Sequence, residues 1–238
     1  MINPKERLRE YLNILINRFL HSKSIYQELL HISAWQISKI GTDTINLSGP
    51  FFQMVNYSMT RIYLVEFASL FSKTEDRSLF DWLDKAYEHA KALEPSIYSP
   101  NATSDRKAIK PREYQTIIQK HISQLDSYSD EINRIKALRD KLIAHFDKSY
   151  FENPRLAFEK YPVTPSEIGE LIETASHIMK KHYSYLFNAD LRMELIVSGN
   201  VDNILFSASA FQQIKNDREL IKSGFMPSKY MVSPFVKD

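Results

Sequence analysis

Apolar residues recur every three or four positions along most of this chain, which is the spacing of helices with one buried face. The first stripe lies in residues 4–19. The second lies in residues 25–40, after the polar residues Ser22-Lys23-Ser24. The pattern predicts two helices with a break between them, and Gly41-Thr42-Asp43 is expected to end the second helix and to cap a third.

Residues 51–71 are apolar nearly all round, which predicts a central helix wrapped by the others. Two charged residues, Arg61 and Glu66, interrupt this stretch. Because an unpaired buried charge costs several kcal/mol, each of them needs a partner or a place at the edge of the core. A structural ion pair or a rim position is therefore favoured over a role in a functional site.

The second half of the chain continues the helical pattern with clearer signals at the helix ends. Ser78 is expected to cap a helix. Thr164-Pro165-Ser166-Glu167 has the composition of a helix start and leads into a long helix that ends near Phe187. Helices are also predicted for residues 111–125 and 128–144, and loops for residues 94–110 and 146–162.

The pattern weakens beyond Asp190. Residues 191–197 and 204–206 fit a hairpin or two short helices, and helices are favoured; residues 215–222 end at Gly224, and the tail after it is expected to be irregular. The whole pattern predicts an all-α fold, a bundle of about six or more helices. Its main domain is expected in residues 1–187, with a C-terminal extension in residues 188–238.

Composition narrows the classes of function. With 238 residues, 43% of them hydrophobic, the chain can bury a substantial core. Five glycines argue against Gly-rich nucleotide folds, and a sequence with no cysteine has no disulfide, thiolate metal site or cysteine nucleophile. The formal charge of +2 is silent on nucleic acids, because binding depends on clustered charge. The N-terminus has a charged helical pattern and every apolar stretch is interrupted, so we expect a cytoplasmic protein with no membrane partner.

Two groups of residues carry weak signals for a binding site. The densest basic cluster begins at Arg106 and Lys107 and extends to Arg112. A solvated loop is the favoured interpretation, and contact with the phosphates of RNA is the alternative. His177 and His182 lie five positions apart, so a regular helix points them in different directions, and packing or surface roles are favoured over metal binding. We expect no metal and no cofactor.

The strongest signal is the segment Arg139-Asp140-Lys141-Leu142-Ile143-Ala144-His145-Phe146-Asp147, which closes the pattern of residues 128–144. An arginine, a polar residue, an apolar spacer and a histidine at a helix end make a plausible acid–base pair, but they also occur at an ordinary helix end. In an ideal helix, positions six apart differ by about 120° around the axis and about 9 Å along it. A joint site of Arg139 and His145 therefore requires the helix to end near Ala144, or a second chain.

This segment resembles the arginine–polar–spacer–histidine motif of the HEPN superfamily (higher eukaryotes and prokaryotes nucleotide-binding domains). It is most similar to the abortive-infection U-type branch, in which the motif is approximately Arg-Asx-Lys-x-x-Ala-His-x-Asp. The segment from Arg61 to Leu79, with Leu70-Phe71-Ser72-Lys73 and Ser78, also resembles the second helix of that branch and its exit. The resemblance covers roughly residues 5–187.

The resemblance implies a metal-independent RNA endonuclease that acts as a homodimer in bacterial stress or phage defence, with a cognate antitoxin or regulator as a further partner. Arg139 and His145 would be the catalytic pair, and Asp140 would orient one of them. Lys141 would bind RNA by making the electrostatic potential at the site more positive. RNA supplies the nucleophile, its 2′-OH, so the protein need only move protons and stabilise charge. A tyrosine two positions after the histidine is common in antitoxin-regulated members, but this chain has Asp147 there, so regulation by nucleotide modification is not predicted.

Two alternatives stay open. Many HEPN domains are non-catalytic modules that bind a nucleotide or a protein, and such a module would keep the cleft without a converging pair. A helical scaffold would instead bury His145 or tie Arg139 into an intramolecular ion pair, with the histidine capping the helix end.

Overall fold

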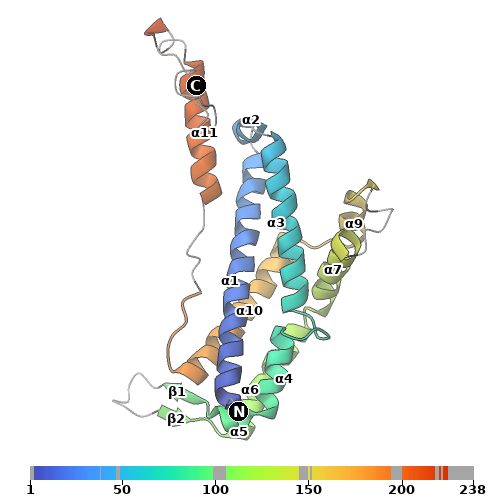
Figure 1. Cartoon of the computed structure of the whole chain (residues 1–238), viewed down its shortest axis with the longest axis vertical. Helices are drawn as coiled ribbons and strands as arrows, with labels where there is room; N and C mark the ends of the chain where they lie inside the picture. Colours follow the sequence, from blue (N-terminus) through green and yellow to red (C-terminus); the bar gives the residue numbers. More distant parts are fainter. Residues whose placement is uncertain are drawn as a thin grey trace. The chain divides into compact units, whose positions relative to one another are not determined.

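The computed structural model describes residues 3–37, 39–46, 49–98, 106–144, 150, 152–193, 200–217, 220 and 222–224. Contacts divide the chain into two compact units. One consists of Met1–Tyr26 and Met59–Ile196, and the other of Gln27–Ser58 and Val197–Asp238. Helices form nearly all of the regular structure (Figure 1), which confirms the predicted all-α, HEPN-like fold. No helix in the described ranges combines the length and the apolar character that crossing a bilayer requires.

The first unit is a helical bundle built on α6. It contains the first part of α1 (Pro4–Ile37), the second part of α3 (Gly49–Leu70), α4 (Leu79–Glu88), α5 (Ala90–Leu93), β1 (Ser96–Tyr98), β2 (Arg106–Ala108), α6 (Pro111–Asp126), α7 (Ser129–Arg139), the π-helix η1 (Asp140–Ala144), α9 (Arg155–Lys160) and α10 (Pro165–Phe187). Helix α6 packs against α4, α5 and α10. The core of this unit contains large, wholly buried side chains from several of these helices: Phe19, Phe67, Phe71, Trp82 and Tyr114.

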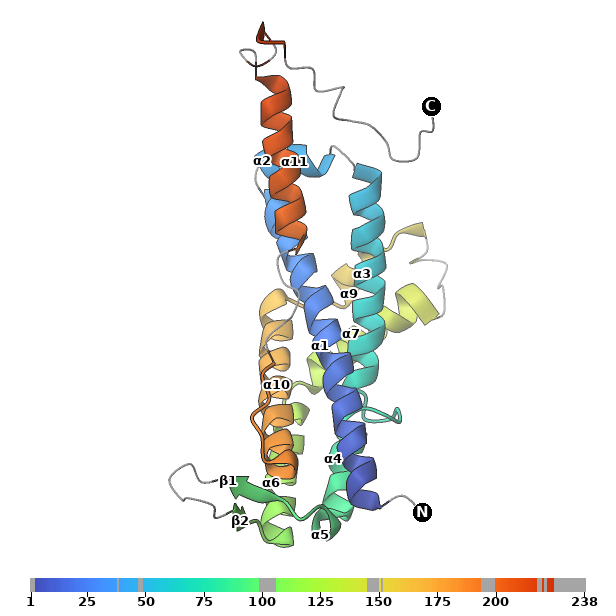
Figure 2. The ribbon, with the colours of Figure 1, turned by 60° about the vertical axis from the view of Figure 1, so that its left-hand side comes forward.

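Helix α1 runs antiparallel to α10 within this unit (Figures 1 and 2). Near the start of α1, Arg9 donates a hydrogen bond to the carbonyl of Leu186. Further along, the hydroxyl of Tyr26 donates to the carbonyl of Pro165 at the beginning of α10 (3.1 Å). These two bonds fix the register of the pair.

The predicted break at Ser22-Lys23-Ser24 is wrong, because α1 continues through it to Ile37. The serine hydroxyls donate to carbonyls one turn back, Ser22 to Arg18 (2.8 Å) and Ser24 to Leu20 (2.9 Å). A serine that bonds back in this way needs no water and can be buried in a helix. Ser22 is wholly buried, so this polar residue, which the sequence pattern assigned to a helix break, belongs to the packed face of α1.

The second unit contains the rest of α1, α2 (Lys39–Asn46), the start of α3 and α11 (Asn200–Asn216). Helix α2 passes through Gly41, where a helix end was predicted, so that prediction is wrong. Thr44 and Ile45 are buried, and α2 contacts α11. This burial offsets the roughly 1 kcal/mol that a glycine costs inside a helix.

Helix α11 replaces the two short helices predicted near the C-terminus. It is one helix, Asn200–Asn216, and residues 191–193 are not helical. Its start is fixed from α1: the N–H of Val201 donates to Glu28 (3.1 Å), and the indole of Trp35 donates to Asp202 (2.7 Å). Residues 194–199 and the tail at residues 225–238 lie outside the described residues.

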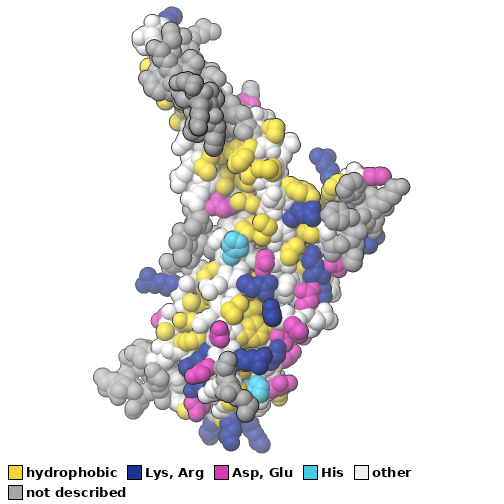
Figure 3. All heavy atoms as spheres, viewed as in Figure 1, with side chains coloured by type: hydrophobic (Ala, Val, Ile, Leu, Met, Phe, Trp, Pro, Cys, Tyr) yellow, Lys and Arg dark blue, Asp and Glu magenta, His cyan; other side chains and the backbone are white. Residues whose placement is uncertain are grey.

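Helix α3 is not the wrapped central helix that was predicted. Only its second half has a buried face, which includes Tyr63, Leu64 and Phe67, whereas Phe51 and Met54 are more than half exposed. Figure 3 shows hydrophobic side chains at the surface along this helix. The interpretation of its charged residues holds for Glu66, which forms an ion pair with Arg18 (2.9 Å).

Both predicted loops contain regular structure. Residues 94–110 hold the antiparallel pair β1 and β2, with Ile97 opposite Lys107. The predicted loop at residues 146–162 holds α9, which follows Pro154 and buries Ala157. Neither element is long enough for a hydrophobic period, so the turn-forming residues around them dominated the sequence pattern.

Two predicted helix caps are confirmed, whereas the cap expected at Thr42-Asp43 is not, because α2 runs through these residues. The hydroxyl of Ser78 accepts the N–H of Asp81 (3.1 Å) at the start of α4. Thr164 and Glu167 form a capping box before α10, with Pro165 in its first turn. The predicted domain boundary after residue 187 remains a proposal, while the contacts group residues 27–58 with the C-terminal part of the chain.

Candidate functional site

Arg139 is the last residue of α7, at the point where the backbone changes from an α-helix to the π-helix η1. Helix α7 buries Ile132, Ile135 and Leu138, as the sequence pattern predicts. The predicted α-helix to Ala144 is wrong in its last turn. The N–H of Asp140 donates to two carbonyls, those of Lys136 and Ala137, at the end of α7. The π-turn η1 starts at Asp140, and single π-turns are frequent at functional sites.

The guanidinium of Arg139 is held by two carboxylates. Its Nε donates to Oδ1 of Asp140 (2.9 Å), and its Nη1 donates to Oε1 of Glu75 (2.6 Å). Nη2 lies 2.8 Å from the same Asp140 oxygen. Burial works against the charged form, but these hydrogen bonds outweigh it and raise the pKa of Arg139. The side chain is 19% exposed and has five N–H donors in all, so donors remain for a ligand.

Glu75 reaches Arg139 because a buried serine shapes the turn after α3. The hydroxyl oxygen of Ser72 accepts the N–H of Thr74 (3.2 Å) and of Glu75 (3.1 Å), and Ser72 is wholly buried. Lys136 on α7 also donates to this oxygen (3.4 Å). The sequence analysis missed Glu75. Its only local signal is its place three residues after Ser72, in the segment that carries the second part of the family resemblance.

The remaining predicted site residues do not all lie together. Asp140 is part of the Arg139 centre, and the ammonium of Lys141 lies 6.0 Å from the centre of the Tyr150 ring. His145 and Asp147 lie outside the described residues, so the pairing of His145 with Arg139 stays a prediction. The described residues hold no group of three or more His, Asp or Glu side chains that could bind a metal ion.

The predicted RNA contacts at Arg106 and Lys107 are separate from Arg139. Both residues lie in β2, directly before α6, whereas α7 follows the other end of α6. A 16-residue helix such as α6 is about 24 Å long. Lys107 is exposed, and the side chain of Arg106 lies outside the described part. The role of the two residues in binding RNA stays a prediction.

A second polar group lies inside the bundle. Nδ1 of His182 is 2.8 Å from the hydroxyl of Tyr114, and its Nε2 is 2.9 Å from Nδ1 of His121. A neutral His182 can accept from the tyrosine and donate to His121. His182 is wholly buried, and it continues the apolar ladder of Ile178 and Leu186 along α10. Its packing role agrees with the interpretation favoured from sequence.

This buried group predicts that the protein is destabilised in acid. Burial is the main cause of a lowered pKa at His121, and with the positive charges of His177, Lys120 and Lys181 it brings this pKa to about 4. Burial also lowers the pKa of His182. The unfolded chain protonates these rings near pH 6.5. Between these values the unfolded state binds more protons, so the free energy of unfolding falls as the pH falls.

We expect His121 to contribute on the order of 1–2 kcal/mol to this loss between pH 6.5 and 4. Urea denaturation at several pH values measures it, comparing the parent with His121→Gln, which cannot titrate. The exposed His21→Gln, on α1, is the matched control and should follow the parent. Equal pH dependence in the parent and His121→Gln would contradict the prediction.

Comparison with known families agrees with this fold and with the resemblance of the segments at residues 61–79 and 139–147. The family model HEPN AbiU2, described as AbiU2, matches residues 42–203, which is more than half of the chain. The chain therefore belongs to this family, the abortive-infection U-type branch of the HEPN superfamily. Neither the curated proteins nor the solved structures contain a match to it.

Proposed function

We propose that this chain is a metal-independent RNA endonuclease in which Arg139 and His145 form the catalytic pair and Asp140 positions the arginine. The observation that carries the proposal is the fixed guanidinium of Arg139, which lies within the family motif and keeps donors free for phosphate oxygens. The proposed unit is a homodimer that brings two motifs together. Its proposed setting is the cytoplasm, where it acts as a toxin in bacterial stress or phage defence, restrained by an antitoxin or regulator.

The chemistry requires only proton transfer and charge stabilisation. The 2′-oxygen of the RNA attacks the neighbouring phosphorus while a histidine removes its proton. The bond from phosphorus to the 5′-oxygen breaks, and that oxygen takes a proton from the imidazolium formed when the histidine removes the 2′-OH proton. Products are a 2′,3′-cyclic phosphate and a 5′-hydroxyl end. Arg139, permanently charged, would stabilise the extra negative charge on the non-bridging oxygens.

One observation favours a second candidate, the helical scaffold in which the motif has a structural role. The charge of Arg139 is balanced by Glu75 and Asp140, as expected for a structural ion pair. A phosphate must displace Glu75 to gain the full charge of the guanidinium. The two candidates therefore differ in whether Arg139 is needed for cleavage or only for stability.

The test is cleavage of total RNA by the purified protein in excess chelator. Arg139→Ala and His145→Ala should lose activity. Arg134→Ala is the matched control, because Arg134 lies on the same helix and is also held by two carboxylates, Glu131 and Glu167. Cleavage by the parent and this control alone supports the proposal. Equal cleavage by all four proteins would reject it. RNA binding without any cleavage would favour a non-catalytic binding module, and neither binding nor cleavage would favour the scaffold.

A further inference from the structure

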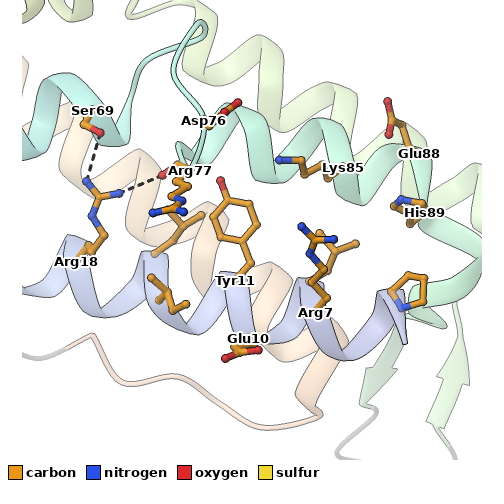
Figure 4. A pocket seen from close by; sticks show the side chains of 14 residues that line it. Arg7, Glu10, Tyr11, Arg18, Ser69, Asp76, Arg77, Lys85, Glu88 and His89 are labelled. Carbon is orange, nitrogen blue, oxygen red and sulfur yellow. Dashed lines mark hydrogen bonds between the residues drawn. The ribbon is translucent and has the colours of Figure 1, made fainter. Parts of the chain in front are cut away.

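A charged groove lies between the first half of α1 on one side and the turn before α4 and the last turn of α4 on the other (Figure 4). Its volume is about 1160 Å³, and every residue that lines it belongs to the first unit. The ring of Tyr11 stands in its middle. The tyrosine is fixed because its hydroxyl donates to Asp81 (2.7 Å), and this carboxylate also accepts from Lys85 (2.7 Å).

The basic side chains of the groove point inward, whereas most acidic ones do not. In Figure 4, Arg7, Arg77 and Lys85 extend toward the ring of Tyr11. Glu10 points to the opposite side of α1, and Glu88 points away from it. Asp76 lies at the rim. Glu10 and Glu88 therefore do not neutralise the cations beside Tyr11, and Asp81 pairs with Lys85.

Two of these cations have no side-chain partner within the described part of the chain. Lys85 forms an ion pair with Asp81, and Arg18 forms one with Glu66. By contrast, the side chains of Arg7 and Arg77 make no hydrogen bond or ion pair with any described residue, and both residues are exposed. Free guanidinium groups beside an aromatic ring are suited to an anionic ligand that carries a flat base.

The backbone of Arg77 supplies a second, independent observation. Its φ is +67°, in the left-handed region that favours glycine. The conformation is held by backbone bonds: its N–H donates to Asp81 (3.1 Å), and its carbonyl accepts from Arg18 (3.1 Å). Glycine would make both bonds without strain. An arginine kept in a strained position indicates that its side chain has a use there.

The same turn joins the groove to the Arg139 centre. Glu75 contacts Arg139, and Arg77, only two residues later, lines the groove. Two residues span at most about 7 Å of backbone. A nucleic-acid strand with one phosphate at Arg139 therefore reaches the groove within a few nucleotides.

We infer that this groove binds the phosphates of the RNA strand next to the cleavage point, through Arg7 and Arg77, with one base stacked on Tyr11. The inference rests on the proposed function for its ligand. It assigns a binding role to residues outside the family motif and on a different part of the bundle.

The test measures binding without cleavage, by fluorescence anisotropy of a labelled 2′-O-methyl RNA oligonucleotide, which lacks the nucleophile. The double variant Arg7→Ala, Arg77→Gly should bind about tenfold more weakly at low salt. The slope of log affinity against log salt should become shallower by about 1.4, for two lost phosphate contacts. Arg77→Gly should not lower the melting temperature, because its φ suits glycine.

The double variant Lys180→Ala, Lys181→Ala is the matched control, since these two exposed lysines on α10 carry the same total charge and do not line the groove. Its affinity should equal that of the parent. Unchanged affinity in the double variant overturns the inference, even if the protein cleaves RNA. A groove-dependent affinity for AMP, without one for the oligonucleotide, also overturns it in favour of a free nucleotide. Because the probe cannot be cleaved, failure of the proposed nuclease activity leaves this measurement intact.

Discussion

Replacing Arg139 with lysine is expected to slow RNA cleavage about a hundredfold or more, although the positive charge is kept. The guanidinium contacts Asp140 and Glu75 at the same time, through different nitrogens. A lysine ammonium is a single point on a flexible stem, so it cannot make both contacts and also fork onto a phosphate. Single-turnover cleavage of a labelled RNA measures the effect.

Arg134→Lys is the control for this substitution, because Arg134 is also held between two carboxylates but lies outside the motif. Its cleavage rate should remain within about twofold of the parent rate, as expected for a surface ion pair. A fully active Arg139→Lys protein would mean that only charge matters at this position. It would remove the argument for bidentate contact with the phosphate.

Trp82→Ala is expected to lower the free energy of unfolding by about 3–5 kcal/mol, the usual cost of truncating a wholly buried aromatic residue. Trp82 lies on α4, and its indole N–H donates to the carbonyl of Leu8 on α1 (2.9 Å). Its ring also packs edge-on against His182, with ring centres 4.9 Å apart. One side chain therefore joins α1, α4 and α10.

Urea denaturation followed by circular dichroism measures this loss. Trp82→Phe is an intermediate variant, because phenylalanine keeps much of the apolar contact but removes the hydrogen bond and leaves a smaller cavity. We expect it to cost about 1–2 kcal/mol. A loss below about 1 kcal/mol for Trp82→Ala would show that the helices repack around the cavity and that the core is not organised by this residue.

The features predicted correctly from sequence are those set by neighbouring residues. Ser78 and the capping box of Thr164 and Glu167 act within one turn, so their chemistry is visible in a short segment. The errors lie where distant contacts decide. Ser22 stays helical because it is buried and bonds back to Arg18, and Phe51 is exposed although its neighbours are apolar.

The candidate site divides in the same way. The motif identified Arg139 and Asp140, which are adjacent and in contact. Glu75 could not be found from the sequence pattern, since it is 64 positions away from Arg139 and reaches it through the turn at Ser72. The groove residues Arg7, on α1, and Arg77, in the turn before α4, are far apart in the sequence and share no local pattern.

The ion pair between Arg139 and Glu75 has a consequence for how such a nuclease would be restrained. Glu75 is a tethered competitor, present at the guanidinium at a high effective concentration. The apparent affinity for a phosphate is reduced by the fraction of time that Arg139 is released. If the proposed function holds, RNA that binds weakly would not displace Glu75, and Arg139 would stay paired. Only a strand that binds tightly enough to displace Glu75 would be cleaved. Glu75 would thus set a minimum affinity that an RNA must reach before it is cleaved.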